Sequence, residues 1–327
     1  MQPPACSPRL AVVGILLLAS VAGCRTLPES GVNTFATSTS TLQLAISSAG
    51  NAAVQDLATL HTDTPASKAA AQALSEDLKQ QWDKRLRVMA AMNTYAASLQ
   101  RLVDAGKAGQ QNAAAFTGAL RELVTATQML DPAAPAIDLA LNLSSRVYGE
   151  IAADIAAGRI ARALAQADPI VAGTSAIIAS DLLNLRSIAL EKRRTALSSL
   201  QTAQILGEFR SLNHLRDAAA TAAFSSDTPT PAALDQLQKI QQMIITLSND
   251  PAYLQYLASR DQINQLFKSQ TDLLDQASLT VAAWARSHHE LLLGIEQKKA
   301  PSLQQLSTFA SDLYDIYKKY REARSTP

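Results

Sequence analysis

The chain has 327 residues, enough for one large domain or two smaller ones, and 47% of them are apolar. Aromatic residues make up only 5% and glycines number 12, which favours helices packed through small side chains and argues against a β-sandwich. The formal net charge of +1 offers no positive field for nucleic acid, and the high apolar content argues against disorder.

Residues 1–24 have the features of a secretory signal. A short leader that carries Arg9 precedes an apolar stretch over 10–23, which is too short to cross a bilayer comfortably. The stretch ends in the sequence Val21-Ala22-Gly23-Cys24. This ending resembles the lipobox of bacterial lipoproteins at every position. The resemblance implies removal of residues 1–23 and acylation of Cys24; the alternative is an ordinary signal peptide that happens to contain a cysteine.

The other cysteine and the residue after Cys24 fit the same interpretation. Cys6 lies within the predicted leader, so the mature chain would keep no cysteine for a disulfide. In proteobacterial lipoproteins, Asp directly after the lipidated cysteine favours retention at the inner membrane. Arg25 occupies that place here, so the resemblance implies an anchor in the outer membrane of the cell envelope.

The mature chain is predicted to consist of a flexible tether over 24–40 and a helical body over 41–324. The tether prediction rests on Pro28, Gly31 and a run of Ser and Thr over 37–41. A first helix is then expected over 41–60, ended by a polar cluster with a proline.

The second predicted helix, over 65–105, has an apolar stripe. Its members follow one another at about 3.5 residues on average, the coiled-coil period. They are Leu74, Leu78, Trp82, Leu86, Met89, Met92, Tyr95, Leu99 and Leu102.

Proline and glycine mark the boundaries of the predicted helices that follow. Helices are expected over 113–130 and 135–166, and a very long one is expected from Pro169 to Ala223 because no proline interrupts it. The polar segment 225–231 predicts a loop.

Three more predicted helices complete the body. Helices are expected over 234–247, from Pro251 to Ile295, and over 301–320. The second of these has a stripe with alternating steps of four and three residues: Ile263, Phe267, Gln270, Leu274, Ala277, Val281, Trp284, His288, Leu291 and Ile295. No segment alternates like a strand. The predicted fold is therefore all-α, an elongated helical bundle with long coiled-coil-like helices, which could divide into sub-bundles over 41–130 and 135–324.

The histidines are the first place to look for chemistry. Adjacent His288 and His289 point about 100° apart on a helix, so they cannot clamp one metal ion. His289-Glu290 begins like a zinc-protease motif, but the second ligand position is Leu293. His288 lies on the apolar stripe, and the nearby carboxylates of Glu290 and Glu296 lie off it, so we predict a packed imidazole whose pKa is lowered by burial.

The rest of the sequence carries no catalytic set. It has no serine elbow, no glycine-rich phosphate loop and no thiol in the mature chain, so we expect no enzyme activity, no cofactor and no metal. The basic run 192–194 is interpreted as an exposed helical surface rather than a lipid-phosphate site. Cys24, as the lipidation site, is the one functional residue that the sequence predicts.

The apolar region 137–180 leaves two interpretations open. A tightly packed bundle centre is favoured over a hairpin that inserts into membranes, because charged residues interrupt the region. The leading hypothesis is thus a non-catalytic envelope lipoprotein, held in the bilayer by acylated Cys24, whose body binds a protein partner or spaces envelope components. A membrane-active protein is the alternative, an envelope enzyme is less favoured, and a second copy of the chain is a further candidate partner.

Overall fold

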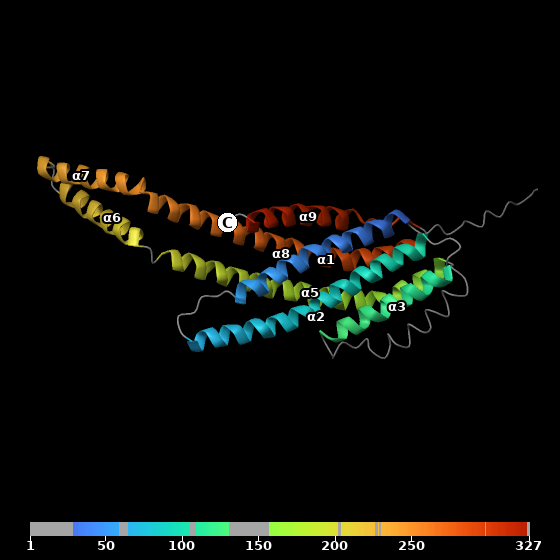
Figure 1. Cartoon of the computed structure of the whole chain (residues 1–327). Helices are drawn as coiled ribbons and strands as arrows, with labels where there is room; N and C mark the ends of the chain where they lie inside the picture. Colours follow the sequence, from blue (N-terminus) through green and yellow to red (C-terminus); the bar gives the residue numbers. More distant parts are fainter. Residues whose placement is uncertain are drawn as a thin grey trace, which may run out of the picture.

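The computed structural model describes residues 29–58, 65–104, 109–130, 157–201, 204–225, 228, 230–297 and 299–325. All regular structure within these ranges is helical. The helices are α1 (Glu29–Ala58), α2 (Pro65–Asp104), α3 (Gly109–Gln128), α5 (Ala157–Leu200), α6 (Gln204–Ala223), α7 (Pro231–Ser248), α8 (Pro251–Gln297) and α9 (Gln304–Ser325). The predicted all-α class and the elongated bundle of long helices are confirmed (Figure 1). The predicted leader, Cys24, Arg25 and the first part of the apolar region, 137–156, lie outside the described residues.

Helices α5 and α8 form the most extensive contact of the bundle. Polar pairs mark their register: Asp168 with His288, Ser175 with the carbonyl of Val281, Arg186 with Asp275, and Arg193 with Asn264. Because the residue numbers rise along α5 as they fall along α8, the two helices are antiparallel.

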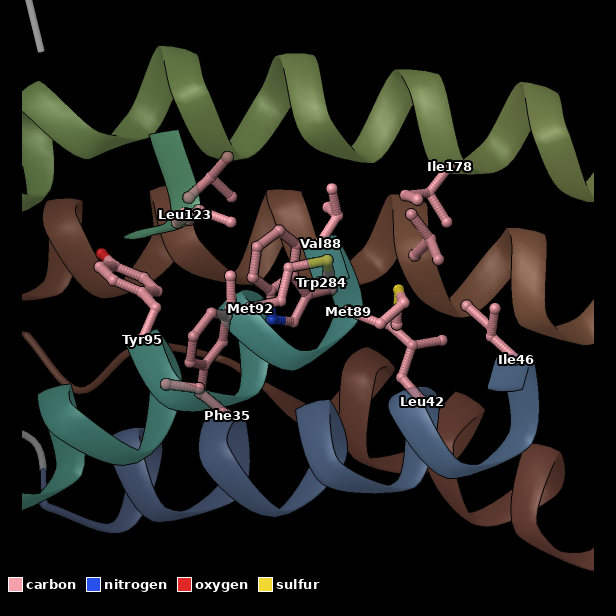
Figure 2. Packing of buried hydrophobic residues seen from close by; sticks show 14 of the residues in the cluster. Phe35, Leu42, Ile46, Val88, Met89, Met92, Tyr95, Leu123, Ile178 and Trp284 are labelled. Carbon is pink, nitrogen blue, oxygen red and sulfur yellow. The ribbon is translucent and has the colours of Figure 1, made fainter. Parts of the chain in front are cut away.

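One continuous core joins the helices around this pair. Its buried side chains come from α1, α2, α3, α5, α8 and α9. Figure 2 shows labelled members from the first five of these helices. Trp284 stacks on Phe35 with ring centroids 5.5 Å apart, and its indole Nε1 donates a hydrogen bond of 2.8 Å to the Thr39 hydroxyl. The core therefore does not follow the suggested division between 41–130 and 135–324.

The predicted stripes define the buried faces of the long helices. Along α8 every member from Phe267 to Ile295 is buried, which confirms the alternating pattern. Along α2 burial begins only at Trp82, whose Nε1 donates to Asn51 of α1 at 3.0 Å, whereas Leu74 is exposed.

The predicted tether over 24–40 is wrong from Glu29 onward, because α1 begins there. Val32 and Phe35 are buried in the core, and this burial favours the helix over a flexible chain. The hydroxyls of Thr34, Thr39 and Thr41 are compatible with the helix, because each bonds back to a carbonyl one turn earlier, as Thr39 does to Phe35 at 2.7 Å.

The predicted boundaries around α5 are also wrong. The helix runs through Pro169, although proline removes one backbone hydrogen bond, because apolar side chains on both sides of it, such as Leu164 and Val171, are buried in the core. It ends at Leu200 instead of continuing to Ala223. No glycine or proline marks this end; α5 packs on α8, whereas α6 packs on α7.

Helices α6 and α7 form a hairpin at one end of the molecule (Figure 1). Thr230 caps α7 by accepting a hydrogen bond from the Ala233 amide at 3.3 Å, and Pro231 occupies the first helical position, where a missing N–H costs nothing. Among the residues of α6 and α7, three are buried: Ala219, Ala223 and Ile240.

Candidate functional site

The structure brings His288 and His289 of α8 together with a carboxylate that the sequence did not indicate. His288 is fully buried, as predicted from the stripe, and His289 is half-exposed. His214 is exposed on α6, and His61 lies outside the described residues.

Four side chains from three helices form one hydrogen-bonded network. The Tyr95 hydroxyl of α2 lies 2.7 Å from His288 Nε2. His288 Nδ1 lies 2.8 Å from one oxygen of Asp168 in α5, and His289 Nδ1 lies 2.9 Å from the other. The network thus joins α2, α5 and α8 through a single buried imidazole.

The chemistry of the partners assigns the proton positions on His288. A carboxylate only accepts hydrogen bonds when ionised, so Nδ1 carries the proton and donates to Asp168. Nε2 is then an acceptor, and the Tyr95 hydroxyl donates to it. Neutral His288 satisfies both of its ring nitrogens in this arrangement.

Burial and the neighbouring groups shift the pKa values of the network. Burial lowers the pKa of His288, and the hydrogen bond and charge of Asp168 offset this effect only in part, so the predicted direction is confirmed. Burial and the negative charge of Asp168 raise the pKa of Tyr95 well above its ordinary value. Burial alone would raise the pKa of Asp168, but hydrogen bonds from His288 and His289 together with their charges lower it.

The order carboxylate, imidazole, hydroxyl is also that of an activated nucleophile. Here, however, the Tyr95 side chain is 0% exposed, and the centroid of its ring lies 5.4 Å from the centroid of the Phe116 ring. Within the part of the chain that the structure describes, the Tyr95 oxygen is therefore covered by protein. Only the edge of Asp168 and the His289 ring reach the surface, with side-chain exposures of 26% and 52%. The geometry therefore supports a structural crosslink of three helices.

Sequence reasoning missed this network because its members are far apart in the chain. The carboxylates considered for His288 were Glu290 and Glu296, its neighbours in sequence, whereas Asp168 lies 120 residues away. No local pattern around Asp168 distinguishes it from other surface carboxylates, so only the α5–α8 register reveals the pairing.

The structure also shows the surroundings of the basic run 192–194 and bears on metal binding and membrane spans. Lys192 forms an ion pair with Asp56 of α1 at 3.0 Å, so this part of the basic run joins two helices rather than facing solvent alone. Among the described residues, no group of three or more His, Cys, Asp and Glu side chains is arranged to hold a metal ion. Of the helices in the described ranges, none is both long enough and apolar enough to span a bilayer.

Comparisons of the chain with protein-family models, with curated proteins and with solved structures find no match.

Proposed function

We propose that the chain is a lipid-anchored protein of the bacterial envelope, whose helical body acts as a non-catalytic spacer and binds a protein partner. The lipobox ending at Cys24 supports the anchor. The length of the body supports the spacing role: α8 alone has 47 residues, which corresponds to about 70 Å of helix.

The observation that carries the partner-binding role is the apolar surface of the α6–α7 hairpin. Large apolar side chains are exposed on the hairpin and on the first turn of α8, beyond the main core: Leu215, Phe224, Leu234, Met243, Ile245 and Leu254. Exposed apolar groups that gather at one end of a protein mark interaction sites. Leu234 and Ile245 lie about three helical turns apart and so share one side of α7. This side is the proposed contact for the partner.

The anchor is tested by metabolic labelling with palmitate. The wild-type chain should be labelled and its leader removed, whereas Cys24→Ala should remain unlabelled and uncleaved. Cys6→Ala is the matched control and should behave as wild type. Label that survives in Cys24→Ala would overturn the lipoprotein assignment.

The partner-binding role is tested by photo-crosslinking in cells. A crosslinking residue at Leu234 or Ile245 should give one discrete protein adduct, and the same residue at exposed Asp312 of α9 should not. Serine at both hairpin positions should remove the adduct formed from a third position on the same side of α7, exposed Gln241, without lowering the melting temperature. Equal adducts from α7 and α9 would contradict a specific surface, and leakage of liposomes caused by the chain would favour the membrane-active alternative.

A further inference from the structure

Four exposed residues form one side of α7, which we call the outer side: Leu234, Gln238, Gln241 and Ile245. They follow one another at steps of four, three and four residues, the spacing that keeps side chains on one stripe of a helix. The pattern reads the same in both directions, with a large apolar residue, two glutamines and a second large apolar residue. Its centre lies between Lys239 and Ile240, which is also the centre of α7 (Pro231–Ser248).

This symmetry makes the outer side complementary to itself. When two α7 helices lie antiparallel about a two-fold axis through that centre, Leu234 of each copy lies opposite Ile245 of the other. Gln238 lies opposite Gln241 in the same way, and their amide groups can both donate and accept hydrogen bonds. The two helices then overlap along all 18 residues of α7. A closed two-fold contact of this kind needs only one self-complementary surface.

The charges of α7 do not oppose the contact of two identical copies. None of the four outer-side residues is charged, so no like charges meet across the axis on this side. The charged residues of α7, Asp235 and Lys239, lie on another side of the helix and pair with each other at 2.8 Å. Antiparallel packing also places the positive N-terminal end of each helix dipole beside the negative C-terminal end of the other.

The two ends of the hairpin fit the same arrangement. Phe224 directly follows α6 at the hairpin tip, and Leu254 lies in the first turn of α8; both side chains are exposed. Antiparallel pairing brings the tip of one copy next to the first turn of α8 in the other, so exposed apolar side chains are present at both ends of the contact. We propose that the partner of the α7 surface is a second copy of the chain, bound through antiparallel α7 helices. This inference rests on the proposed role of the hairpin.

The pairing also determines how the two molecules lie. Gly31, near the start of α1, lies against Leu291 and Pro301 at the C-terminal end of α8, whereas the hairpin leads into the N-terminal end of α8. The start of α1 and the hairpin are therefore at opposite ends of the molecule (Figure 1). Two copies joined at α7 extend in opposite directions from the contact, so the pair is longer than one molecule of the proposed spacer.

Disulfide trapping in bacterial cells tests the pairing. Full chains with Leu234→Cys and Ile245→Cys carry different epitope tags, are produced together and are treated with a mild oxidant. The mixed disulfide should form, because opposed residues come within the roughly 7 Å Cα separation that a disulfide allows. Two copies of Leu234→Cys should not join, because antiparallel packing separates these positions by about 16 Å along the axis.

Two controls define the background. The wild-type chain shows any disulfide that involves Cys6 or Cys24, its only cysteines. Met243→Cys, which is exposed on another side of α7, replaces Ile245→Cys in the matched control. With Leu234→Cys it should give at least about tenfold less mixed disulfide than Ile245→Cys does.

A charge exchange tests the centre of the contact in the same trapping assay. Gln238→Glu with Gln241→Glu brings carboxylates of the two copies together and should reduce the mixed disulfide by about tenfold. Gln238→Lys with Gln241→Glu places opposite charges across the axis and should keep the yield. Both positions are exposed, so neither double variant should lower the melting temperature.

The outcomes separate this inference from the proposed function. An adduct of the crosslinking residue at position 234 with a different protein, without the mixed disulfide, would keep the hairpin as a partner site and overturn the pairing of two copies. Disulfides between two Leu234→Cys copies would mean parallel helices and would also overturn it, as would equal yields with Met243→Cys. If neither adduct nor disulfide forms, both the hairpin contact and the pairing are wrong.

Discussion

Replacing His288 by leucine tests the buried network most directly. Leucine fills much of the same space and keeps apolar contact with Phe35, whose ring lies 6.0 Å from the imidazole. It removes the acceptor for the Tyr95 hydroxyl and the donor to one oxygen of Asp168. His288→Leu therefore isolates the polar role of this position from its packing role.

The two lost hydrogen bonds differ in cost. The Tyr95 hydroxyl is wholly buried, so losing its acceptor should cost about 1–3 kcal/mol. Asp168 keeps its hydrogen bond from His289 and reaches water, so losing the hydrogen bond from His288 should add little to the cost. We expect His288→Leu to lower the free energy of unfolding by about 1–3 kcal/mol at pH near 8. The double variant Tyr95→Phe with His288→Leu should recover most of this loss, because both partners are then apolar.

The pH dependence follows from the direction of the pKa shifts. Because the pKa of His288 is lowered by folding, the unfolded chain binds a proton that the folded chain does not as pH falls below about 6.5. Wild-type stability should therefore fall between pH of about 6.5 and the folded pKa, and the His288→Leu deficit should shrink there. The pKa of Asp168 is also lowered, so its contribution is lost only below about pH 4, outside this window.

Urea unfolding at pH near 5 and near 8 measures both effects. The second histidine that contacts the carboxylate, His289, supplies the control: His289→Leu removes an exposed bond and should change stability much less. The reasoning fails if wild type and His288→Leu show the same pH dependence, or if the single variant costs nothing near pH 8.

The remaining predictions concern packing and an ion pair. A methyl group at Gly50 would overlap the indole of Trp82, so Gly50→Ala should destabilise the chain by about 1–3 kcal/mol in urea unfolding. Gly118 of α3 has open space instead, so Gly118→Ala should stabilise by about 0.5–1 kcal/mol, and the same sign for both variants would contradict the packing. The Arg85 guanidinium donates two hydrogen bonds, at 2.8 and 3.0 Å, to the carboxylate of Asp181 in α5, and both groups are mostly buried. Arg85→Ala should therefore lower the free energy of unfolding by about 1.5–3 kcal/mol, whereas a change within error would mean that α2 and α5 are not held by this pair.

The sequence predicted most reliably those features that depend on regular spacing. The stripe along α8 identified its buried face, including His288, because apolar residues at steps of four and three lie on one side of any helix. Helix ends were less predictable. Proline suggested a break at 169, but the core contacts of α5 carry the helix through it.

The candidate network could not be predicted from the sequence, because no local pattern indicates which residues of different helices come into contact. Tyr95 and His288 were both placed on stripes, yet nothing in either stripe indicates that they meet across the core. Their pairing follows from the register of α2 against α8, and the role of Asp168 follows from the register of α5 against α8. Long-range register is set by the whole core at once, so the site could be recognised only after the helices were packed.

Register also explains why an apolar core contains these polar groups. Stripes of similar apolar side chains allow helices to slide by one or two turns with little loss of packing. A slide of α8 would separate His288 from Tyr95 and Asp168, and would also separate Trp284 from Thr39, leaving buried groups unpaired. Each unpaired group raises the energy of the shifted arrangement, whereas the native arrangement pairs the buried polar groups of Tyr95, His288 and Trp284. The network thereby favours one alignment of a long bundle, which the proposed spacing role would require.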